Sequence, residues 1–207
     1  MRVRAITPDK LVGELVDAVE QLRAPWPRVA VDGATGTAEF ADELVEPLRV
    51  RGREVVRIST WRYVRPASLR LEHGRDDPDS FYESWFDFDG LRREALDPLA
   101  PGGSGLVLPA LWDLAADRSP RLDRVRLPGR GVLVVDGPLL LGAGLPFDLT
   151  AHLWLPGGSL RRRLPEQEHW TLPAFDRYSA EVAPERTADV VVRADRPGHP
   201  AVVDGFE

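Results

Sequence analysis

One stretch, residues 28–44, constrains the fold more than any other part of this sequence. The apolar residues 29–31 (Val-Ala-Val) enter a glycine-rich turn at 33–36, and apolar residues then recur at helical spacing. This order predicts a strand, a tight loop and a helix. In α/β proteins such a unit directs free backbone N–H groups and the positive end of the helix dipole toward one point, which suits a phosphate group.

The loop departs from the phosphate-binding consensus G-x-x-x-x-G-K-[ST] at most of its defining positions. When Gly33 opens the consensus, Ala38 replaces the second glycine, Glu39 replaces the lysine and the phenyl ring of residue 40 replaces the hydroxyl. The lysine normally neutralises the terminal phosphates and the hydroxyl holds Mg²⁺, so both functions are lost. The residues expected to bind a nucleotide are Gly33, Ala34, Thr35, Gly36, Thr37, Ala38 and Glu39.

The composition indicates one domain and argues against several classes of function. The chain has 207 residues, of which 43% are hydrophobic, enough for a single domain with a full core. Its net charge of -6 and its scattered basic residues argue against a nucleic-acid partner. It contains no cysteine and its four histidines lie far apart, so we expect no disulfide and no metal site. No apolar run is long enough to span a membrane and the N-terminus does not resemble a signal peptide, which predicts a cytoplasmic protein without membrane contact.

Apolar strand patterns alternate with helical patterns along the chain. Thr7 and Pro8 fit the start of a first helix over 8–23. Further helices are expected over 39–51, 88–99, 159–164 and 173–182. Strands are expected at 28–32, 54–59, 131–136, 151–155 and 188–193. Because the strands are apolar and alternate with helices, the pattern predicts a parallel sheet of about five strands covered by helices on both faces.

Three regions do not follow this alternation. Residues 60–78 are rich in Arg, Pro and Asp and predict an ordered surface loop at the end of a strand, where function is often found. Residues 81–86 carry four aromatic side chains, which either line a ring-binding pocket or form part of the core under that loop. Strand patterns at 106–114 and 122–127 predict that residues 104–128 form a small β-insertion off the main sheet.

The order of these segments resembles the uridine kinase-like family of the P-loop kinases, particularly its short bacterial members. The resemblance extends over residues 28–195, although each motif is weak by itself. The segments that carry it are Val29-Ala-Val-Asp-Gly, Phe40-Ala-Asp-Glu-Leu, Arg65-Pro, Gly74-Arg-Asp-Asp-Pro, Phe81-Tyr-Glu-Ser-Trp-Phe-Asp, Leu96-Asp-Pro-Leu, Val132-Leu-Val-Val-Asp-Gly-Pro-Leu-Leu-Leu, Arg161-Arg-Arg and Ala188-Asp-Val-Val-Val.

The resemblance implies a three-layer α/β fold, with a P-loop kinase-like parallel sheet, helices on both faces, a small β-insertion and a short lid. On this basis residues 1–207 form a single uridine kinase-like domain. Residues 1–24 would add an N-terminal helix, 104–128 would be the insertion, and 157–184 would form the lid and the helix that follows it.

Two elements that the family uses for catalysis are missing here. The family's loop, Gly-x-x-Gly-x-Gly-Lys-Thr/Ser-Thr, directly precedes a helix similar to residues 40–44. An alignment anchored on that helix implies that the loop has lost two residues, and it leaves no lysine either. The family also places an acidic pair just past the second strand, with an Asp as base for the nucleoside 5′-hydroxyl. Aligned through Arg65 and Pro66, that pair falls on Trp61 and Arg62, so we assign no catalytic residue.

The resemblance also implies a nucleoside pocket between the carboxyl edge of the sheet and the lid. Residues that end or follow the second and third strands of the five would converge there, and three arginines stand in the lid position. Those arginines either meet an anion or form the solvated face of a short helix. The candidate pocket residues are Trp61, Arg62, Tyr63, Arg65, Tyr82, Trp85, Asp136, Arg161, Arg162 and Arg163.

Three functions remain open, each with a small molecule as the partner. The first is a non-catalytic relative that binds a nucleotide or metabolite or has a regulatory role. The second is an active ATP-dependent phosphotransferase acting on a nucleoside or other small hydroxyl compound; it would need ATP and Mg²⁺, with Asp32 and Asp136 as candidate metal ligands. The third is an NADP-binding reductase, because residues 33–39 resemble the turn of short-chain reductases and Arg57 with Ser59 would suit a 2′-phosphate. The oligomeric state stays open.

Overall fold

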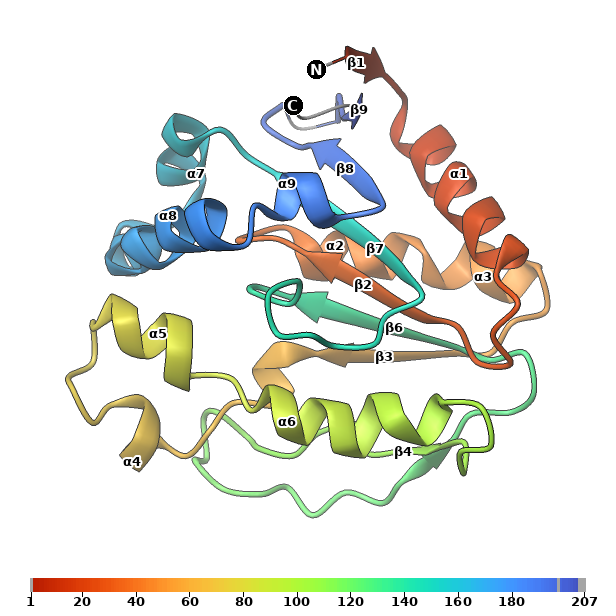
Figure 1. Cartoon of the computed structure of the whole chain (residues 1–207), viewed down its shortest axis with the longest axis horizontal. Helices are drawn as coiled ribbons and strands as arrows, with labels where there is room; N and C mark the ends of the chain where they lie inside the picture. The colour runs from red at the N-terminus through yellow and green to blue at the C-terminus, as the bar shows by residue number, and fades with distance from the viewer. Residues whose placement is uncertain (1, 197, 205–207) are drawn as a thin grey trace.

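A central sheet of seven strands organises the molecule (Figure 1). The computed structural model describes residues 2–196 and 198–204. Along the sheet the strand order is β1-β9-β8-β7-β2-β6-β3. The strands are β1 (Arg2–Ala5), β2 (Arg28–Asp32), β3 (Val55–Ser59), β6 (Val132–Gly137), β7 (Leu149–Trp154), β8 (Val190–Arg193) and β9 (Ala201–Asp204).

The five strands predicted from the sequence form the parallel centre of this sheet. β2 pairs in parallel with β6 and β7, β6 pairs with β3, and β7 pairs with β8. Each strand begins and ends within a few residues of its predicted range. β9 and β1 extend the sheet at one edge in antiparallel pairing. The apolar pattern does not predict β1, because all of its residues are exposed.

Three helices cover one face of the sheet: α1 (Pro8–Gln21), α2 (Thr37–Glu43) and α3 (Val45–Val50). Thr7 caps α1 as predicted, since its hydroxyl oxygen accepts the N–H of Lys10. The prediction of a single helix over 39–51 is wrong, because α2 and α3 meet at Leu44. Pro47 has no N–H to donate to the carbonyl of residue 43, so a helical hydrogen bond is missing at this junction.

The segment between β3 and β6 packs on the other face of the sheet and contains several short helices. They are η1 (Thr60–Arg62), α4 (Ala67–Arg70), α5 (Pro78–Ser84), α6 (Phe88–Leu91), the π-helical turn η2 (Arg92–Leu96) and the 3₁₀ turn η3 (Asp97–Leu99). Residues 60–78 are therefore not a loop throughout, contrary to the prediction. Ser59 caps η1 and Asp77 caps α5, each through its side-chain oxygen, and both are local signals for a helix start. Within the insertion range, β4 (Leu106–Val107) and β5 (Val125–Arg126) pair in a separate two-stranded sheet.

The chain after β7 returns over the same face as α6. It forms α7 (Gly157–Arg163), η4 (Glu166–Thr171), α8 (Leu172–Glu181) and α9 (Pro184–Thr187) before it enters β8. These helices close over the carboxyl ends of the central strands (Figure 1). The predicted helices at 159–164 and 173–182 correspond to α7 and α8.

Alternate residues of the central strands face the two helical layers. In β6, Val132 and Val134 pack with α1 to α3, whereas Leu133 and Val135 pack with the helical segment after α5. All six residues of β6 are buried, and β6 lies between β2 and β3 in the interior of the sheet. The sheet thus has a core on each side, which confirms the predicted α/β architecture with a mostly parallel sheet and helices on both faces.

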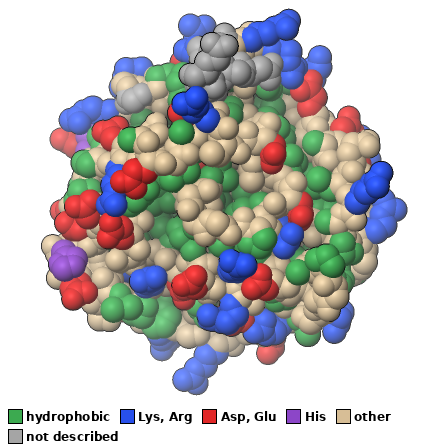
Figure 2. Space-filling model, in the orientation of Figure 1, with side chains coloured by type: hydrophobic (Ala, Val, Ile, Leu, Met, Phe, Trp, Pro, Cys, Tyr) green, Lys and Arg blue, Asp and Glu red, His purple; other side chains and the backbone are tan. Residues whose placement is uncertain are grey.

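Figure 2 shows the surface in the orientation of Figure 1. Hydrophobic side chains gather toward the middle of this face, while Lys, Arg, Asp and Glu side chains are interspersed around them. Within the described part of the chain, no helix combines the length and the apolar character that crossing a membrane requires.

Candidate functional site

The loop that follows β2 lies at the carboxyl edge of the sheet, as predicted. Its last residue, Gly36, has φ 77° and caps α2, a left-handed conformation that side-chain-bearing residues adopt at a cost. Its first residue, Gly33, packs against Leu153 of β7, where an added Cβ would lie 3.1 Å from the Leu153 Cβ. Gly33 therefore allows close packing and Gly36 allows the sharp entry into α2.

The first turn of α2 carries a negative charge and no positive one. Thr37 is buried, while Ala38 and Glu39 are exposed at the same end of the helix. The chain's single lysine, Lys10, belongs to α1. Backbone N–H groups and the helix dipole still favour an anion at this end, but Glu39 opposes it.

A cleft lies beside this loop, on the side of the sheet that α1 and α2 cover. It has a volume of about 220 Å³ and is lined by Thr35, Gly36 and Glu39, together with Arg163 of α7 and Arg196 after β8. The guanidinium of Arg163 donates to the carbonyl of Ala194 at 2.7 Å, which fixes it at the rim. Of the candidate residues, three from the loop and one lid arginine therefore share a cavity.

Asp136, at the carboxyl end of β6, forms an ion pair with Arg57. It is 1% exposed, and its Oδ1 accepts a hydrogen bond from Nη2 of Arg57 at 2.9 Å. Arg57 also reaches α2, where Nη1 lies 3.1 Å from Asp42 and donates to the carbonyl of Ala38. Burial raises the pKa of Asp136, and Arg57 opposes that rise. Among the described residues, no group of three His, Cys, Asp or Glu side chains is placed to hold a metal ion.

The predicted aromatic residues pack mainly with one another. Trp61 and Trp85 lie with ring centroids 6.3 Å apart, and both contact Phe81, which is 2% exposed. Tyr63 is fully buried in the core behind them and donates its hydroxyl to the carbonyl of Leu108, so it does not face a pocket. This arrangement supports the interpretation of the aromatic run as part of the core.

The remaining candidates point in different directions. The hydroxyl of Tyr82 donates to Glu181 at 3.1 Å, which ties α5 to α8. The N–H of Arg65 donates to the carbonyl of Trp85, and Arg62 is exposed. Arg161 and Arg162 are exposed on α7, where Arg162 donates to Ser159 of its own helix. Only Arg163 of the lid arginines lines the cleft.

A buried polar cluster that the sequence patterns do not indicate lies on the opposite face of the sheet. Asp32 is 0% exposed and its Oδ2 lies 2.6 Å from Nδ1 of His152. The hydroxyl of Tyr178, on α8, donates to the same oxygen at 3.1 Å and accepts the N–H of Leu141 at 2.9 Å. Burial, and then the charge on Asp32, raise the pKa of Tyr178 well above its usual range, so the phenol keeps its proton.

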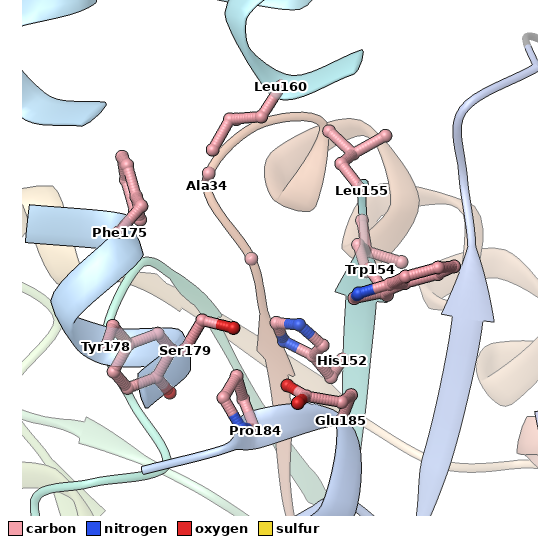
Figure 3. Close-up of a pocket in the computed structure, with 12 residues that line it drawn as sticks. Ala34, His152, Trp154, Leu155, Leu160, Phe175, Tyr178, Ser179, Pro184 and Glu185 are labelled. Carbon is pink, nitrogen blue, oxygen red and sulfur yellow. The ribbon is translucent and has the colours of Figure 1, made fainter. Parts of the chain in front are cut away.

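This cluster forms part of the wall of a second cavity, shown in Figure 3. The cavity has a volume of about 70 Å³ and lies between β7 and the helices α8 and α9. His152, Trp154 and Tyr178 contribute side chains to it, and Glu185 of α9 closes one side. The signal that could have revealed the cluster is the register of β2 and β7, in which Asp32 and His152 are direct partners.

Comparisons with known proteins establish the fold. No protein-family model matches this chain, and no curated protein matches it in sequence. A possible uridine kinase from Bacillus stearothermophilus superposes with a TM-score of 0.71 at 18% identity, over 88% of this chain and 97% of that one. A Silicibacter protein described as a fructose transport system kinase superposes with a TM-score of 0.58 at 20% identity, over 88% and 93% of the two chains. A D-glycerate 3-kinase from Cryptococcus neoformans gives 0.52 at 14% identity, over 85% and 80%. The chain therefore has a P-loop kinase-like fold.

The strand order is not that of a dinucleotide-binding sheet. In the doubly wound dinucleotide fold the first and second strands of the unit are neighbours. Here β6 lies between β2 and β3, which are the corresponding strands. Arg57, considered as a partner for a 2′-phosphate, is instead held by Asp136 and Asp42. The NADP-binding reductase hypothesis is therefore wrong in its fold and in its proposed contact.

Proposed function

We propose that this protein is a non-catalytic relative of the P-loop nucleoside kinases, which binds a nucleotide or a related small metabolite in the cleft beside residues 33–39. The observation that carries the proposal is the charge at the start of α2, where Glu39 is the only charged side chain of the first turn. A transferred phosphoryl group needs cationic compensation, and the loss of one preorganised electrostatic contact typically lowers a rate by about 10²–10³. The sequence resemblance implies that two elements are lost, the lysine of the phosphate-binding loop and the catalytic acid past the second strand.

The state of Asp136 supports the same proposal. A kinase of this fold uses an acid at the end of this strand to hold Mg²⁺ directly or through water. Here Nη2 of Arg57 donates a hydrogen bond to Oδ1 of Asp136 at 2.9 Å, so the carboxylate already has a cationic partner. A cation can replace the guanidinium only if a buried ion pair is broken, which typically costs about 3–5 kcal/mol. The ion pair with Arg57 therefore opposes metal binding at Asp136. Among the described residues, no group of three His, Cys, Asp or Glu side chains is placed to bind the ion either.

The cleft retains features that suit a small ligand. Phe40, Leu155 and Val192 give it apolar walls, and Arg163 with Arg196 supplies positive charge at its rim. Its volume of about 220 Å³ is smaller than that of most ligand pockets, about 300–1,000 Å³. We therefore expect it to hold a small metabolite, or the nucleoside end of a larger ligand.

Isothermal titration and a coupled kinase assay test this proposal together. Uridine, UMP, ATP and Mg-ATP are titrated into the protein, and uridine, cytidine, D-glycerate and fructose are offered as acceptors at saturating Mg-ATP. We expect binding of at least one nucleoside or nucleotide and no turnover. Turnover near 1–100 per second, the usual range for kinases, would reject the non-catalytic assignment. Absence of any binding would reject the ligand assignment and leave a scaffolding role.

The alternative is an active phosphotransferase in which an arginine replaces the lysine of the phosphate-binding loop. The observation that favours it is the position of Arg163, which lines the same cleft as Thr35 and Gly36. An Arg163→Met variant separates the two proposals. It would abolish turnover if the alternative holds, whereas the non-catalytic protein has no turnover to lose and should show only weaker binding of anionic ligands.

A further inference from the structure

The cavity between β7 and α8 adjoins the nucleotide cleft, because Leu153 and Leu155 line both spaces. Side chains alternate along β7, and His152 and Trp154 line the cavity but not the cleft. The loop after β2 separates the two spaces, since Gly33 and Ala34 border the cavity and Thr35 and Gly36 border the cleft. A ligand that contacts His152 would therefore lie on the other side of this loop from Thr35 and Gly36.

The hydrogen bonds of His152 define the chemistry of the cavity. Asp32 accepts the N–H of Leu140 and the hydroxyl of Tyr178, so it acts as a carboxylate that accepts from Nδ1–H of His152 as well. In a neutral imidazole with hydrogen on Nδ1, the other nitrogen, Nε2, is an acceptor. In that form the ring offers an acceptor to a ligand in the cavity.

Glu185 adds a second acceptor. Its Oε2 is buried and has no hydrogen-bond partner. Figure 3 shows the Glu185 carboxylate, the imidazole of His152 and the hydroxyl of Ser179 arranged around the same space. A buried carboxylate oxygen without a partner is costly, and such a group in a native fold points to a donor that binds there.

The rest of the wall favours a cation of small size. Among the described residues, no Lys or Arg lines the cavity, whereas Trp154, Phe175 and Tyr178 contribute aromatic surface that attracts cations. The guanidinium of Arg193 lies 5.9 Å from the Trp154 ring centroid and is paired with Asp195. A volume of about 70 Å³ corresponds to roughly five water-sized positions. Only a group of a few non-hydrogen atoms fits.

We propose that this cavity is a binding site for a small primary amine, whose ammonium group donates to Oε2 of Glu185 and Nε2 of His152 while its carbon chain packs against Trp154 and Phe175. The site goes beyond the proposed nucleotide function and does not depend on it. Two acceptors beside aromatic walls match a primary ammonium, which carries three donors on a short alkyl stem.

The experiment uses n-propylamine as the probe, with propan-1-ol and propionate as neutral and anionic analogues of similar size. Each is titrated into protein labelled with ¹⁵N in its imidazole rings, without nucleotide. We expect the amine to shift the resonances of His152 saturably, with at least fivefold higher affinity than the alcohol and no saturable effect of propionate. His73 and His199, which are both exposed, serve as internal controls and should not move.

A pair of matched variants tests the carboxylate. Glu185→Gln keeps the shape of the side chain and removes its charge, so amine affinity should fall at least tenfold and approach that of the alcohol. Glu166→Gln makes the same change at an exposed position outside the cavity and should leave amine binding unchanged. Equal affinity of the wild-type protein for amine and alcohol, or an undiminished amine preference in Glu185→Gln, would overturn the proposal. The wild-type titration decides the matter even if Glu185→Gln does not fold.

Discussion

Asp32 and His152 lie opposite each other in the parallel pairing of β2 and β7, and Oδ2 of Asp32 is 2.6 Å from Nδ1 of His152. The same carboxylate accepts the N–H of Leu140 after β6 and the hydroxyl of Tyr178 on α8. One buried side chain therefore connects two neighbouring strands, the loop that follows a third and the helix above them. Because every donor is satisfied, the cluster holds α8 against the sheet and gives the second cavity a fixed wall.

The first prediction concerns Tyr178 in this cluster. Tyr178→Phe removes a hydroxyl that bridges Asp32 and the N–H of Leu141, and it leaves that partly buried N–H without its partner. We expect the free energy of unfolding, measured with urea, to fall by about 1–3 kcal/mol. Tyr82→Phe is the matched control, because the bond from Tyr82 to Glu181 is exposed and its loss should change stability by less than about 0.5 kcal/mol. Equal effects of the two variants would contradict a structural role for the cluster.

The second prediction compares one substitution at two glycines. Gly36→Ala places a Cβ in open space but forces φ 77° on an L-residue, so stability should fall by about 1–2 kcal/mol. Gly13→Ala also meets nothing within 4 Å, but Gly13 lies inside α1, so stability should rise by about 0.5–1 kcal/mol. Thermal unfolding of both variants beside the wild type measures the two signs. A stabilising Gly36→Ala would show that the loop does not need its left-handed residue.

The third prediction is a pH dependence that arises at Asp136. Because burial raises its pKa above the ordinary value of 3.8, the folded chain binds this proton more tightly than the unfolded chain. Stability from this group is therefore lost as pH rises from about 3.8 through the folded pKa. Arg57→Met removes the charge that limits the rise, so it should extend the loss to higher pH and lower stability at pH 7 by about 3–5 kcal/mol.

Urea unfolding of Arg57→Met between pH 4 and pH 8 checks this prediction. The deficit relative to the wild type should shrink as the pH falls toward 4, because protonation of Asp136 removes its unpaired charge, and the double variant with Asp136→Asn should lose most of the pH dependence. Arg51→Met is the control, since Arg51 and Asp17 form an exposed pair, with side chains 48% and 64% exposed, worth at most about 1 kcal/mol. A pH-independent deficit in Arg57→Met would mean that packing of the arginine, and not its charge, stabilises the protein.

The sequence predicted the fold well where one residue type dominates a segment. The first four residues of β6 are an unbroken apolar run, which is typical of a strand buried on both faces. Thr7 and Pro8 likewise mark the start of α1 through local chemistry alone. The break between α2 and α3 was missed because the apolar period continues across Pro47. The antiparallel edge strands were missed because β1 is exposed and pairs with β9, at the other end of the sequence, and because both strands are only four residues long.

The candidate site was predicted less well, because it depends on register and orientation. Position along the chain indicated that Trp61 and Trp85 lie near the lid, but it did not show that they contact each other within an aromatic cluster. Asp136 was expected at the carboxyl edge of the sheet. Its partner Arg57 lies on the neighbouring strand β3, so the contact depends on the pairing of β3 with β6. His152 lies 120 residues from Asp32, so only the pairing of β2 and β7 brings the two together.

The last prediction concerns the charge at the start of α2. Glu39→Lys changes the charge there by two units, and each unit is worth about 1 kcal/mol for a pair 4 Å apart in water. ATP affinity, measured by isothermal titration at low salt, should therefore rise by about 2 kcal/mol, or roughly thirtyfold. The gain should shrink as salt is added, because residue 39 is exposed and salt screens the interaction between exposed charges.

Glu43→Lys is the matched control for this charge, since Glu43 also lines the cleft but lies one turn further from the loop. The same change in net charge should then raise ATP affinity far less. If Glu39→Lys and Glu43→Lys have equal effects, the gain reflects overall charge, and Glu39 does not occupy the position of the lysine in a phosphate-binding loop. If neither variant changes ATP affinity, the loop has lost two residues relative to a phosphate-binding loop, and its N–H groups cannot surround a phosphate even when a lysine is restored. A gain in affinity without turnover is the result that we expect, because the acid at the end of β6 remains paired with Arg57.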